Sequence, residues 1–395
     1  MSPVSAYSRR RDPLRPVPFA VQLVLHKKTR VAVAASGIGF AILVIFVQLG
    51  FYSSVINTAL AVSARFEADL VLISPRFAYL GATGTIPAAR LYQAQAHPEV
   101  VGTTPIYFRY ADWRDPANGA NCRLFAIGFP LAAETDRSPL LLAGVDEQLS
   151  NLRPTNTLLL DRLTRKKCGP ASAGGDNVEI RNRAARVVGD FSMGVGFLAD
   201  GAMLMSDDTF SRFFDGHPLD EPHVGLIRLA PDSDADEVAL SLRGTLPKDV
   251  RVITRDDLND LQTRHWVENT AVGDIFGMGA LAGFMVGVVV LFQILSTDIR
   301  NHLPLYATLR AMGYSERKLT RYVLEQSWIY AILGFGPALV VSLMIFPAIQ
   351  GATNLPIFIT PTLVIGILAL SVVMCSVSAL ISARRLGRAD PAELF

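Results

Sequence analysis

Three apolar regions divide the chain, one before and two after a long polar stretch. Residues 31–64 and 275–297 contain no charged side chain, and the uncharged region 326–383 is long enough for two membrane crossings at about 20 residues each. The pattern predicts one span, a large water-facing domain and then three more spans. We therefore expect a membrane protein with four transmembrane α-helices in a 1+3 arrangement.

The polar stretch between the first two spans has the pattern of a mixed α+β domain. Short aliphatic and β-branched runs are separated by clusters of Gly, Pro, Asn and Asp, and they predict strands at residues 70–73, 157–160, 178–180, 202–205 and 224–229. Residues 235–246 have the apolar spacing of an amphipathic helix. Strands and helices within one stretch favour an α+β fold.

The first apolar region is longer than one crossing requires. A helix over residues 31–64 would extend roughly 50 Å, against a hydrocarbon core of about 30 Å. We expect transmembrane helix 1 at residues 31–52 and a stalk helix at 53–66, where polar side chains enter. On the return side, residues 257–270 contain neither Pro nor Gly, which predicts a second stalk helix at 257–274. An ordinary loop is the alternative for either stalk.

The remaining boundaries follow from the same pattern. They are a basic N-terminal segment at 1–30, the α+β domain at 67–256, transmembrane helix 2 at 275–297, a cytoplasmic connecting segment at 298–321, helix 3 at 322–348, an external turn at 349–358, helix 4 at 359–383 and a tail at 384–395. The net charge of +2 is too small to indicate a nucleic-acid partner.

Basic side chains lie on one side of the predicted membrane. Seven Lys or Arg residues and one acid precede the first span, further basic residues follow the second and fourth spans, and the turn at 350–356 carries no charge. Because basic flanks stay in the cytoplasm, we expect both termini there and the large α+β domain on the outer side of the membrane. A cleaved signal peptide is the alternative for the first span, but its apolar core normally has only about 7 to 15 residues.

Catalytic chemistry is sparse in the α+β domain. Its candidate groups are Asp69, Asp161, Asp190, Asp200, Asp207, Asp208, His97, His217, His223 and His265. They show neither a metal-ligand spacing nor a nucleophile elbow, so we interpret them as solvated surface groups. No Gly-Lys dipeptide occurs, which excludes a Walker A loop. We therefore expect a non-catalytic protein without a cofactor or metal. If it uses ATP, another chain must bind the nucleotide.

Two of the three cysteines, Cys122 and Cys168, fall in the α+β domain, and Cys375 falls in the fourth span. An oxidising compartment would permit a disulfide between the first two. Without geometry, two cysteines are weak support for a bond, and buried thiols are our default interpretation. Cys375 is interpreted as a small packing residue.

Three glycines in the second span, Gly279, Gly283 and Gly287, recur at a spacing of four residues. Small residues at this spacing let two helices approach closely in lipid. A contact within one subunit and a homodimer interface are equally open. Gln48 and Gln293 interrupt the apolar runs of the first two spans and are expected to donate interhelical hydrogen bonds.

The cytoplasmic connection after the second span predicts a short amphipathic helix. Pro304 suits its first position, Leu305, Leu309 and Met312 follow at i, i+4 and i+7, and Gly313 suits its end. Such a helix would lie on lipid headgroups or fill a groove on another protein. The candidate contact residues of this helix are Pro304, Leu305, Leu309, Arg310, Met312 and Gly313.

Two segments of the chain resemble a known family. The stretches DIRNHLPLYATLRAMGYSERKL (298–319) and ARRLGRADPAELF (383–395), with the 1+3 layout, are similar to permease subunits of the MacB/FtsX superfamily of ABC systems. Within it, EADLVLIS, LLLDRLTRK and FSMGVGFLADGAMLMSDDTF resemble DevC-type permeases. The extra basic segment 1–18 departs from the usual pattern and leaves open whether the usual partners apply.

The resemblance implies a permease homodimer joined to a separate ABC ATPase of the DevA type, which would bind and hydrolyse ATP. The short cytoplasmic helix, with its segment 298–321, would be the coupling helix that docks into that ATPase. The periplasmic domain would act on a membrane-fusion adaptor of the DevB type and a TolC-like outer-membrane channel, and would expel lipid-like cargo such as a glycolipid, or other hydrophobic cargo. An FtsX-like signalling permease or a lipoprotein-release permease is the alternative, and a membrane-anchored enzyme would need a catalytic cluster that the residues lack.

Overall fold

The computed structural model describes residues 28–114, 119–131, 137–168, 177–312, 314–353 and 355–384. These residues divide into two compact units. The membrane unit comprises the described parts of Met1–Leu49, Gly277–Met344 and Ile359–Phe395, and the outer unit comprises those of Gly50–Phe276 and Ile345–Phe358.

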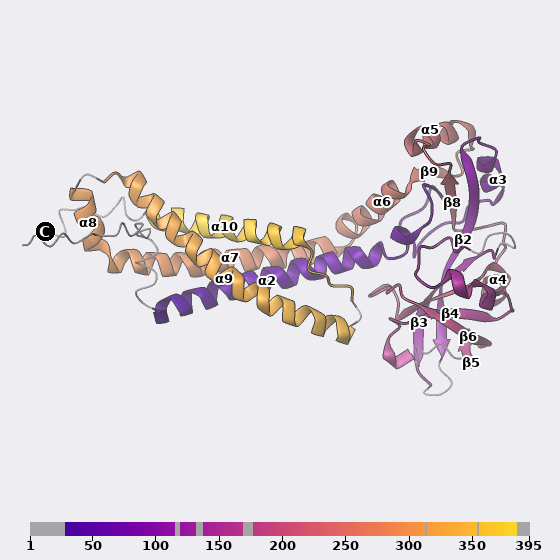
Figure 1. Ribbon diagram of the computed structural model, residues 1–395, viewed down its shortest axis with the longest axis horizontal. Helices are drawn as coiled ribbons and strands as arrows, with labels where there is room; N and C mark the ends of the chain where they lie inside the picture. The colour runs from indigo at the N-terminus through magenta and orange to yellow at the C-terminus, as the bar shows by residue number, and fades with distance from the viewer. Residues whose placement is uncertain are drawn as a thin grey trace, which may run out of the picture. The chain divides into compact units, whose positions relative to one another are not determined.

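In the described part of the chain, four helices are long and apolar enough to cross a membrane. They are α2 (Lys28–Ala59), α7 (Ala271–Asn301), α9 (Glu316–Thr353) and α10 (Pro361–Ala383). The short helix α8 (Leu303–Ala311) connects α7 to α9 (Figure 1). The predicted 1+3 arrangement of four apolar helices is confirmed, and the protein is a multi-pass membrane protein.

Local sequence signals explain where several helices begin. Thr360 caps α10 by accepting a hydrogen bond from the Leu363 backbone N–H at 3.2 Å, and Pro361 follows it. In α6 (Arg255–Glu268), the side chain of Thr254 accepts from the Asp257 N–H, and the Asp257 side chain accepts from the Thr254 N–H. This capping box satisfies backbone donors that the first helical turn leaves open.

The helix ends differ in detail from the expected stalks. Helix α2 ends at Ala59, where the sequence predicted a stalk through residue 66, and a turn leads into a 3₁₀ segment, η1 (Ser63–Arg65). Residue 269 follows the end of α6, and α7 begins at Ala271, so the expected stalk 257–274 contains a break. Helix α9 continues to Thr353, into the expected external turn.

The outer unit contains a mixed sheet in which nine strands are described. They are β1 (Leu70–Ile73), β2 (Val100–Arg114), β3 (Asn121–Phe129), β4 (Thr157–Asp161), β5 (Asn177–Ile180), β6 (Arg183–Phe191), β7 (Gly201–Ser206), β8 (Val224–Leu229) and β9 (Arg251–Thr254). Their order is β3-β7-β4-β6-β5-β2-β8-β1-β9, with β3 also paired to β2. The pairs β3–β7 and β4–β6 are parallel, and the other pairs are antiparallel. All five predicted strands are confirmed.

Short helices accompany this sheet in the chain. They are α3 (Ala89–Gln95), α4 (Asp207–Phe213) and α5 (Ala235–Thr245), with 3₁₀ segments η2 (Asp146–Leu152) and η3 (Lys166–Cys168). Strands β1, β4 and β7 are buried at every position, because other elements cover both of their faces. The predicted amphipathic helix at 235–246 is confirmed as α5, with Val238, Ala239 and Leu242 buried.

The chain enters and leaves the sheet on neighbouring strands. Strand β1 follows η1, and β9 leads directly into α6. The two strands pair antiparallel, with Leu70 opposite Thr254 and Ile73 opposite Arg251. The first and last strands of the sheet domain therefore lie side by side.

Candidate functional site

The predicted coupling helix is present as α8. His302 occupies its N-cap position, Pro304 lies in its first turn, and Arg310 lies in its last turn. Thr308 donates its hydroxyl proton to the Pro304 carbonyl at 2.9 Å, so the exposed face of this short helix carries an internal hydrogen bond. The turn ends at Met312, whose backbone N–H bonds back to the Thr308 carbonyl.

The apolar residues expected to share one face of α8 are not, where the structure describes them, the residues that are most buried. Met312 is 63% exposed and Leu309 is half-buried, whereas the buried side chain is Tyr306 at 6% exposure. The Leu305 side chain and Gly313 lie outside the described residues. Met312 is thus open to a partner, while Tyr306, which the sequence reading passed over, anchors the helix inside the membrane unit.

The glycine stripe of α7 faces α2 within the same chain. A Cβ at Gly283 would lie 3.1 Å from Ile45 and 3.2 Å from Val44, and Gly279 lies against the Gln48 carboxamide. Gly287 adjoins Ala41 of α2 and also Met374 of α10. Close helix approach of this kind is a main source of packing energy in lipid. Of the two contacts left open by the sequence, the structure therefore supplies the one within a subunit.

A second glycine contact joins α2 to α9. A Cβ on Gly39 would lie 3.1 Å from the Gly334 carbonyl oxygen, and a Cβ on Gly334 would lie 2.9 Å from Ile38. A side chain at either position would therefore crowd the facing helix, and the backbone or Ile38 would have to shift. Neither Gly39 nor Gly334 belongs to a spacing motif that the sequence brought out.

At the base of the outer unit, η1 and α6 share a buried polar network. The Ser63 hydroxyl donates to the Asn259 side-chain oxygen at 2.7 Å and accepts from Gln262 Nε2 at 2.7 Å. The Gln262 oxygen in turn accepts from the Leu80 N–H at 3.4 Å. Ser63 and Gln262 are almost fully buried. Buried polar groups that are fully bonded fix one arrangement of their elements, so η1 and α6 are held as a pair.

A buried carboxylate holds the glycine-rich turn 194–197. Asp161 accepts hydrogen bonds from the backbone N–H groups of Leu163, Met193 and Gly194 at 3.0, 3.1 and 2.7 Å. Burial raises the pKa of Asp161, and these three hydrogen bonds oppose that rise. Asp161 was expected at the surface as a solvated acid, and that expectation is wrong.

This turn packs on the end of α2 and on α6. Gly196 has φ of +54°, and a Cβ there would lie 2.5 Å from the Thr58 hydroxyl oxygen of α2. The next residue, Phe197, meets the Trp266 ring edge-on, with ring centroids 5.0 Å apart. Trp266 also packs against Tyr79 at 5.5 Å. The turn therefore connects both helix ends of the outer unit to its sheet.

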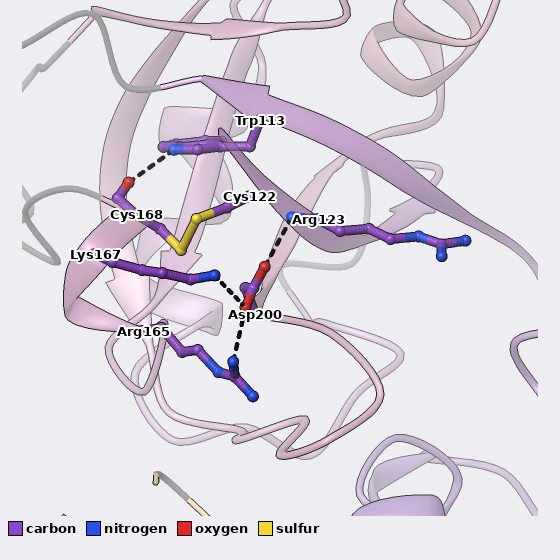
Figure 2. Close-up of a disulfide and its surroundings, with 7 residues drawn as sticks. All are labelled: Trp113, Cys122, Arg123, Arg165, Lys167, Cys168 and Asp200. Atoms are coloured by element: carbon purple, nitrogen blue, oxygen red, sulfur yellow. Dashed lines mark hydrogen bonds and ion pairs between the residues drawn. A yellow bond between two sulfur atoms is a disulfide. The ribbon is translucent and has the colours of Figure 1, made fainter. Parts of the chain in front are cut away.

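Cys122 and Cys168 form a disulfide, with Cα atoms 5.8 Å apart (Figure 2). Our default interpretation of buried thiols was wrong, because the sequence does not show that β3 and η3 lie together. Trp113 donates its indole N–H to the Cys168 carbonyl at 2.9 Å. Disulfides persist in oxidising compartments, so the bond favours an extracytoplasmic location for this domain.

Asp200 lies beside the disulfide among cationic groups (Figure 2). Its carboxylate is 3.2 Å from both Arg165 and Lys167 and accepts from the Arg123 N–H at 3.1 Å. These groups lower the pKa of Asp200 in spite of its partial burial. The two sulfurs and this carboxylate lie within 4.8 Å of one another, but bonded sulfurs are not thiolate metal ligands.

Two of the candidate histidines are buried, which corrects their interpretation as surface groups. The rings of His217 and His223 stack with centroids 5.0 Å apart, at 7% and 6% exposure. His223 Nδ1 accepts from the Phe108 N–H at 3.2 Å. Burial, then the neighbouring His217 and Arg109, lower the pKa of His223 to about 3. His223 therefore stays neutral and serves as a core hydrogen-bond acceptor.

Comparison with known proteins identifies the C-terminal region. Residues 277–391 match the family model for the FtsX-like permease C-terminal region. No curated protein matches the chain significantly. The periplasmic region of MacB from Actinobacillus actinomycetemcomitans is 14% identical, with a TM-score of 0.35 over 52% of this chain and 95% of that one. The extracellular domain of the ABC-type transporter YknZ from Gram-positive bacteria is 10% identical, with a TM-score of 0.32 over 47% of this chain and 98% of that one.

The matched region contains all of α8, α9 and α10 and most of α7. The predicted resemblance to the MacB/FtsX superfamily is confirmed for this region, which matches FtsX-like permeases. The DevC-type subclass stays a prediction. The coupling role of α8 also stays a prediction, although the family match includes that helix.

Proposed function

We propose that this permease of the MacB/FtsX superfamily is the membrane subunit of an ABC export system. In this proposal a separate DevA-like ATPase binds and hydrolyses ATP, and the permease, as a homodimer, performs no catalysis and carries no cofactor. A DevB-like adaptor and a TolC-like outer-membrane channel receive its motion and expel lipid-like cargo, such as a glycolipid. The single observation that carries the proposal is the FtsX-like match over residues 277–391.

The outer unit has the construction that a mechanical role requires. The end of α2 contacts the glycine-rich turn at Gly196, and η1 and α6 are joined by Ser63 and Gln262. Inside the membrane unit, α2 contacts α7 and α9 through glycines. An α-helix is a stiff rod, so an axial movement of α2 or α7 reaches both of its ends. These contacts support transmission of movement to the sheet domain.

The orientation that we propose has the outer domain in the periplasm and both termini in the cytoplasm, with the protein in the inner membrane. Two independent observations support it. The basic residues flank the cytoplasmic ends of the spans, as the positive-inside rule describes. The disulfide lies in the domain assigned to the oxidising side.

The test is a crosslinked pull-down of the tagged full chain from native membranes, compared with Leu309→Asp. Leu309 is half-buried on α8, so a carboxylate there disturbs the helix and its surface without touching the outer unit. We expect the unchanged protein to retain an ABC ATPase and a membrane-fusion adaptor. The variant should retain the adaptor and lose most of the ATPase, by about tenfold or more.

The matched control is Leu240→Asp, an exposed leucine of α5 in the outer unit. It should retain the ATPase fully. Recovery of an ATPase together with an activator of a cell-wall hydrolase, and of no adaptor, would reject the export proposal in favour of a signalling permease. Equal ATPase recovery with Leu309→Asp would reject α8 as the docking helix.

A further inference from the structure

One buried carboxylate in the membrane unit joins the two long helices that flank α8. Asp298 lies near the end of α7 and is 9% exposed, and Gln326 lies on α9 and is 5% exposed. Gln326 Nε2 donates to Asp298 Oδ2 at 2.6 Å. This bond closes the loop of chain that contains α8, because it ties the helix before α8 to the helix after it.

The same carboxylate adjoins the start of α8. The His302 ring, at the N-cap of α8, places Nδ1 at 2.9 Å from the Asp298 carbonyl oxygen and at 3.5 Å from its carboxylate. Tyr306, one turn further along α8, is buried, and burial followed by the Asp298 charge raises its pKa to about 12. Groups of α8 and α9 therefore surround one side chain of α7.

The location of this group makes it unlike an ordinary surface acid. A buried carboxylate is tolerated when hydrogen bonds compensate its lost hydration, and removing one partner leaves the other unsatisfied. The exposed groups of α8, among them Thr308, Arg310 and Met312, keep a fixed orientation only while the buried side of the helix is held. In the described part of α8, Tyr306 supplies that buried side.

We propose that Asp298 is a positioning residue, which sets the orientation of α8 by bonding Gln326 and adjoining His302 and Tyr306. The inference rests on the proposed function only where it assigns α8 to ATPase docking. With the bond intact, α7, α8 and α9 move together, so a displacement of α8 by the ATPase also displaces the two membrane helices α7 and α9. Without the bond, the orientation of α8 relative to α7 and α9 changes, and a displacement of α8 no longer moves these helices.

The test exchanges the donor and the acceptor. Gln326→Glu places two carboxyl groups at hydrogen-bond distance, and Asp298→Ala removes the acceptor. The double variant Asp298→Asn with Gln326→Glu restores a bond of reversed polarity, because the new amide at 298 donates to the new carboxylate at 326. Asp298→Asn and Gln326→Glu are nearly isosteric, so a role in packing alone predicts little effect of Gln326→Glu and nothing for the second substitution to rescue. Rescue is therefore measured against Gln326→Glu.

The first readout needs no ATPase. A nitroxide is attached at Met312→Cys in the full chain in lipid nanodiscs, where the native cysteines are either disulfide-bonded or, for Cys375, buried. We expect greater label mobility in Asp298→Ala and Gln326→Glu, and mobility close to the parent in the double variant. Unchanged mobility in both single variants, or no rescue in the double variant, would overturn the proposal.

The second readout is the ATPase retained in the pull-down. We expect about tenfold less in each single variant, since a lost buried hydrogen bond has an effect of this order, and recovery to within about twofold in the double variant. If the label responds and is rescued while no ATPase copurifies with any form, the positioning role stands and the proposed function fails. If ATPase copurifies equally with all forms while the label is unaffected, the positioning role fails and the proposed function stands.

Discussion

The membrane unit and the outer unit hold their elements together in different ways. In the membrane unit, α2 meets α7 and α9 where Gly283, Gly39 and Gly334 remove side-chain bulk. In the outer unit, strand pairing, a disulfide and buried polar networks at Ser63 and Asp161 fix the elements. Smooth glycine contacts can repack by small shifts, whereas a satisfied polar network has one good arrangement. The difference predicts that substitutions in the membrane unit act mainly through helix packing, whereas substitutions in the outer unit act through a single bond or network.

We expect the largest effect from removal of the disulfide bond of the outer unit. Replacing Cys122 and Cys168 together by Ser should lower the free energy of unfolding of the outer unit by about 4 kcal/mol, because the bond closes a chain separation of 46 residues. Urea unfolding followed by the fluorescence of the buried Trp113, which bonds to Cys168, measures this change. Cys375→Ala, in the membrane unit, is the control. A loss below about 1 kcal/mol would show that the outer unit does not depend on the link.

The next effect concerns the glycine contacts of the membrane unit. Gly334→Leu should lower the stability of the helix bundle by about 2 kcal/mol, because the new side chain collides with Ile38 and the backbone of Gly39. Gly336→Leu, two residues along the same helix with open space around it, is the matched control and should change stability by less than about 0.5 kcal/mol. Thermal unfolding in detergent measures both. Equal effects of the two substitutions would contradict the packing described here.

The third prediction uses the buried histidine pair. The pKa of folded His223 is lowered to about 3 from an ordinary value of 6.5, so the unfolded chain binds the additional proton. The stability of the outer unit should therefore fall as the pH drops below about 6.5, with a slope of up to about 1.4 kcal/mol per pH unit from this group. His223→Gln should remove this slope, as measured by urea unfolding between pH 7 and pH 5. His97→Gln is the control, and an unchanged slope in His223→Gln would remove His223 as its source.

We expect the smallest effect from a substitution in the hydrogen-bond network between η1 and α6. Ser63→Ala should make opening of α6 easier by about 1 kcal/mol, because Gln262 and Asn259 lose their shared partner. Amide hydrogen exchange around Asn259 and Gln262 should become several-fold faster. The exposed Ser150, changed to Ala, is the control. Exchange that is unaltered in Ser63→Ala would mean that another contact holds η1 to α6.

Periodicity and composition predicted much of the architecture. The four apolar helices and the strands at 70–73 and 224–229 were predicted because uncharged runs and β-rich runs bounded by turn residues are local signals. The long strands β2, β3 and β6 were not predicted, since they mix charged and apolar residues. Each also pairs with a strand far away in the sequence, β2 with β8, β3 with β7 and β6 with β4, and local patterns carry no information on such pairings.

The candidate site was less predictable for the same reason. Spacing revealed the glycines of α7, but their partners on α2 and the Gly39–Gly334 contact depend on how the helices pack. The bond between Cys122 and Cys168 depends on the placement of β3 beside η3. On α8, an apolar stripe could be read from the sequence, but the burial of Tyr306 depends on neighbours from other helices.

The pairing of Leu70 with Thr254 has a consequence for the history and the engineering of this protein. Paired strands lie about 4.8 Å apart. The chain therefore enters the sheet at Leu70 and leaves it at Thr254 at almost the same place. A domain whose two ends lie side by side can be replaced by another domain without changing the distance between the helices that flank it. The membrane helices can thereby be combined with a different sheet domain.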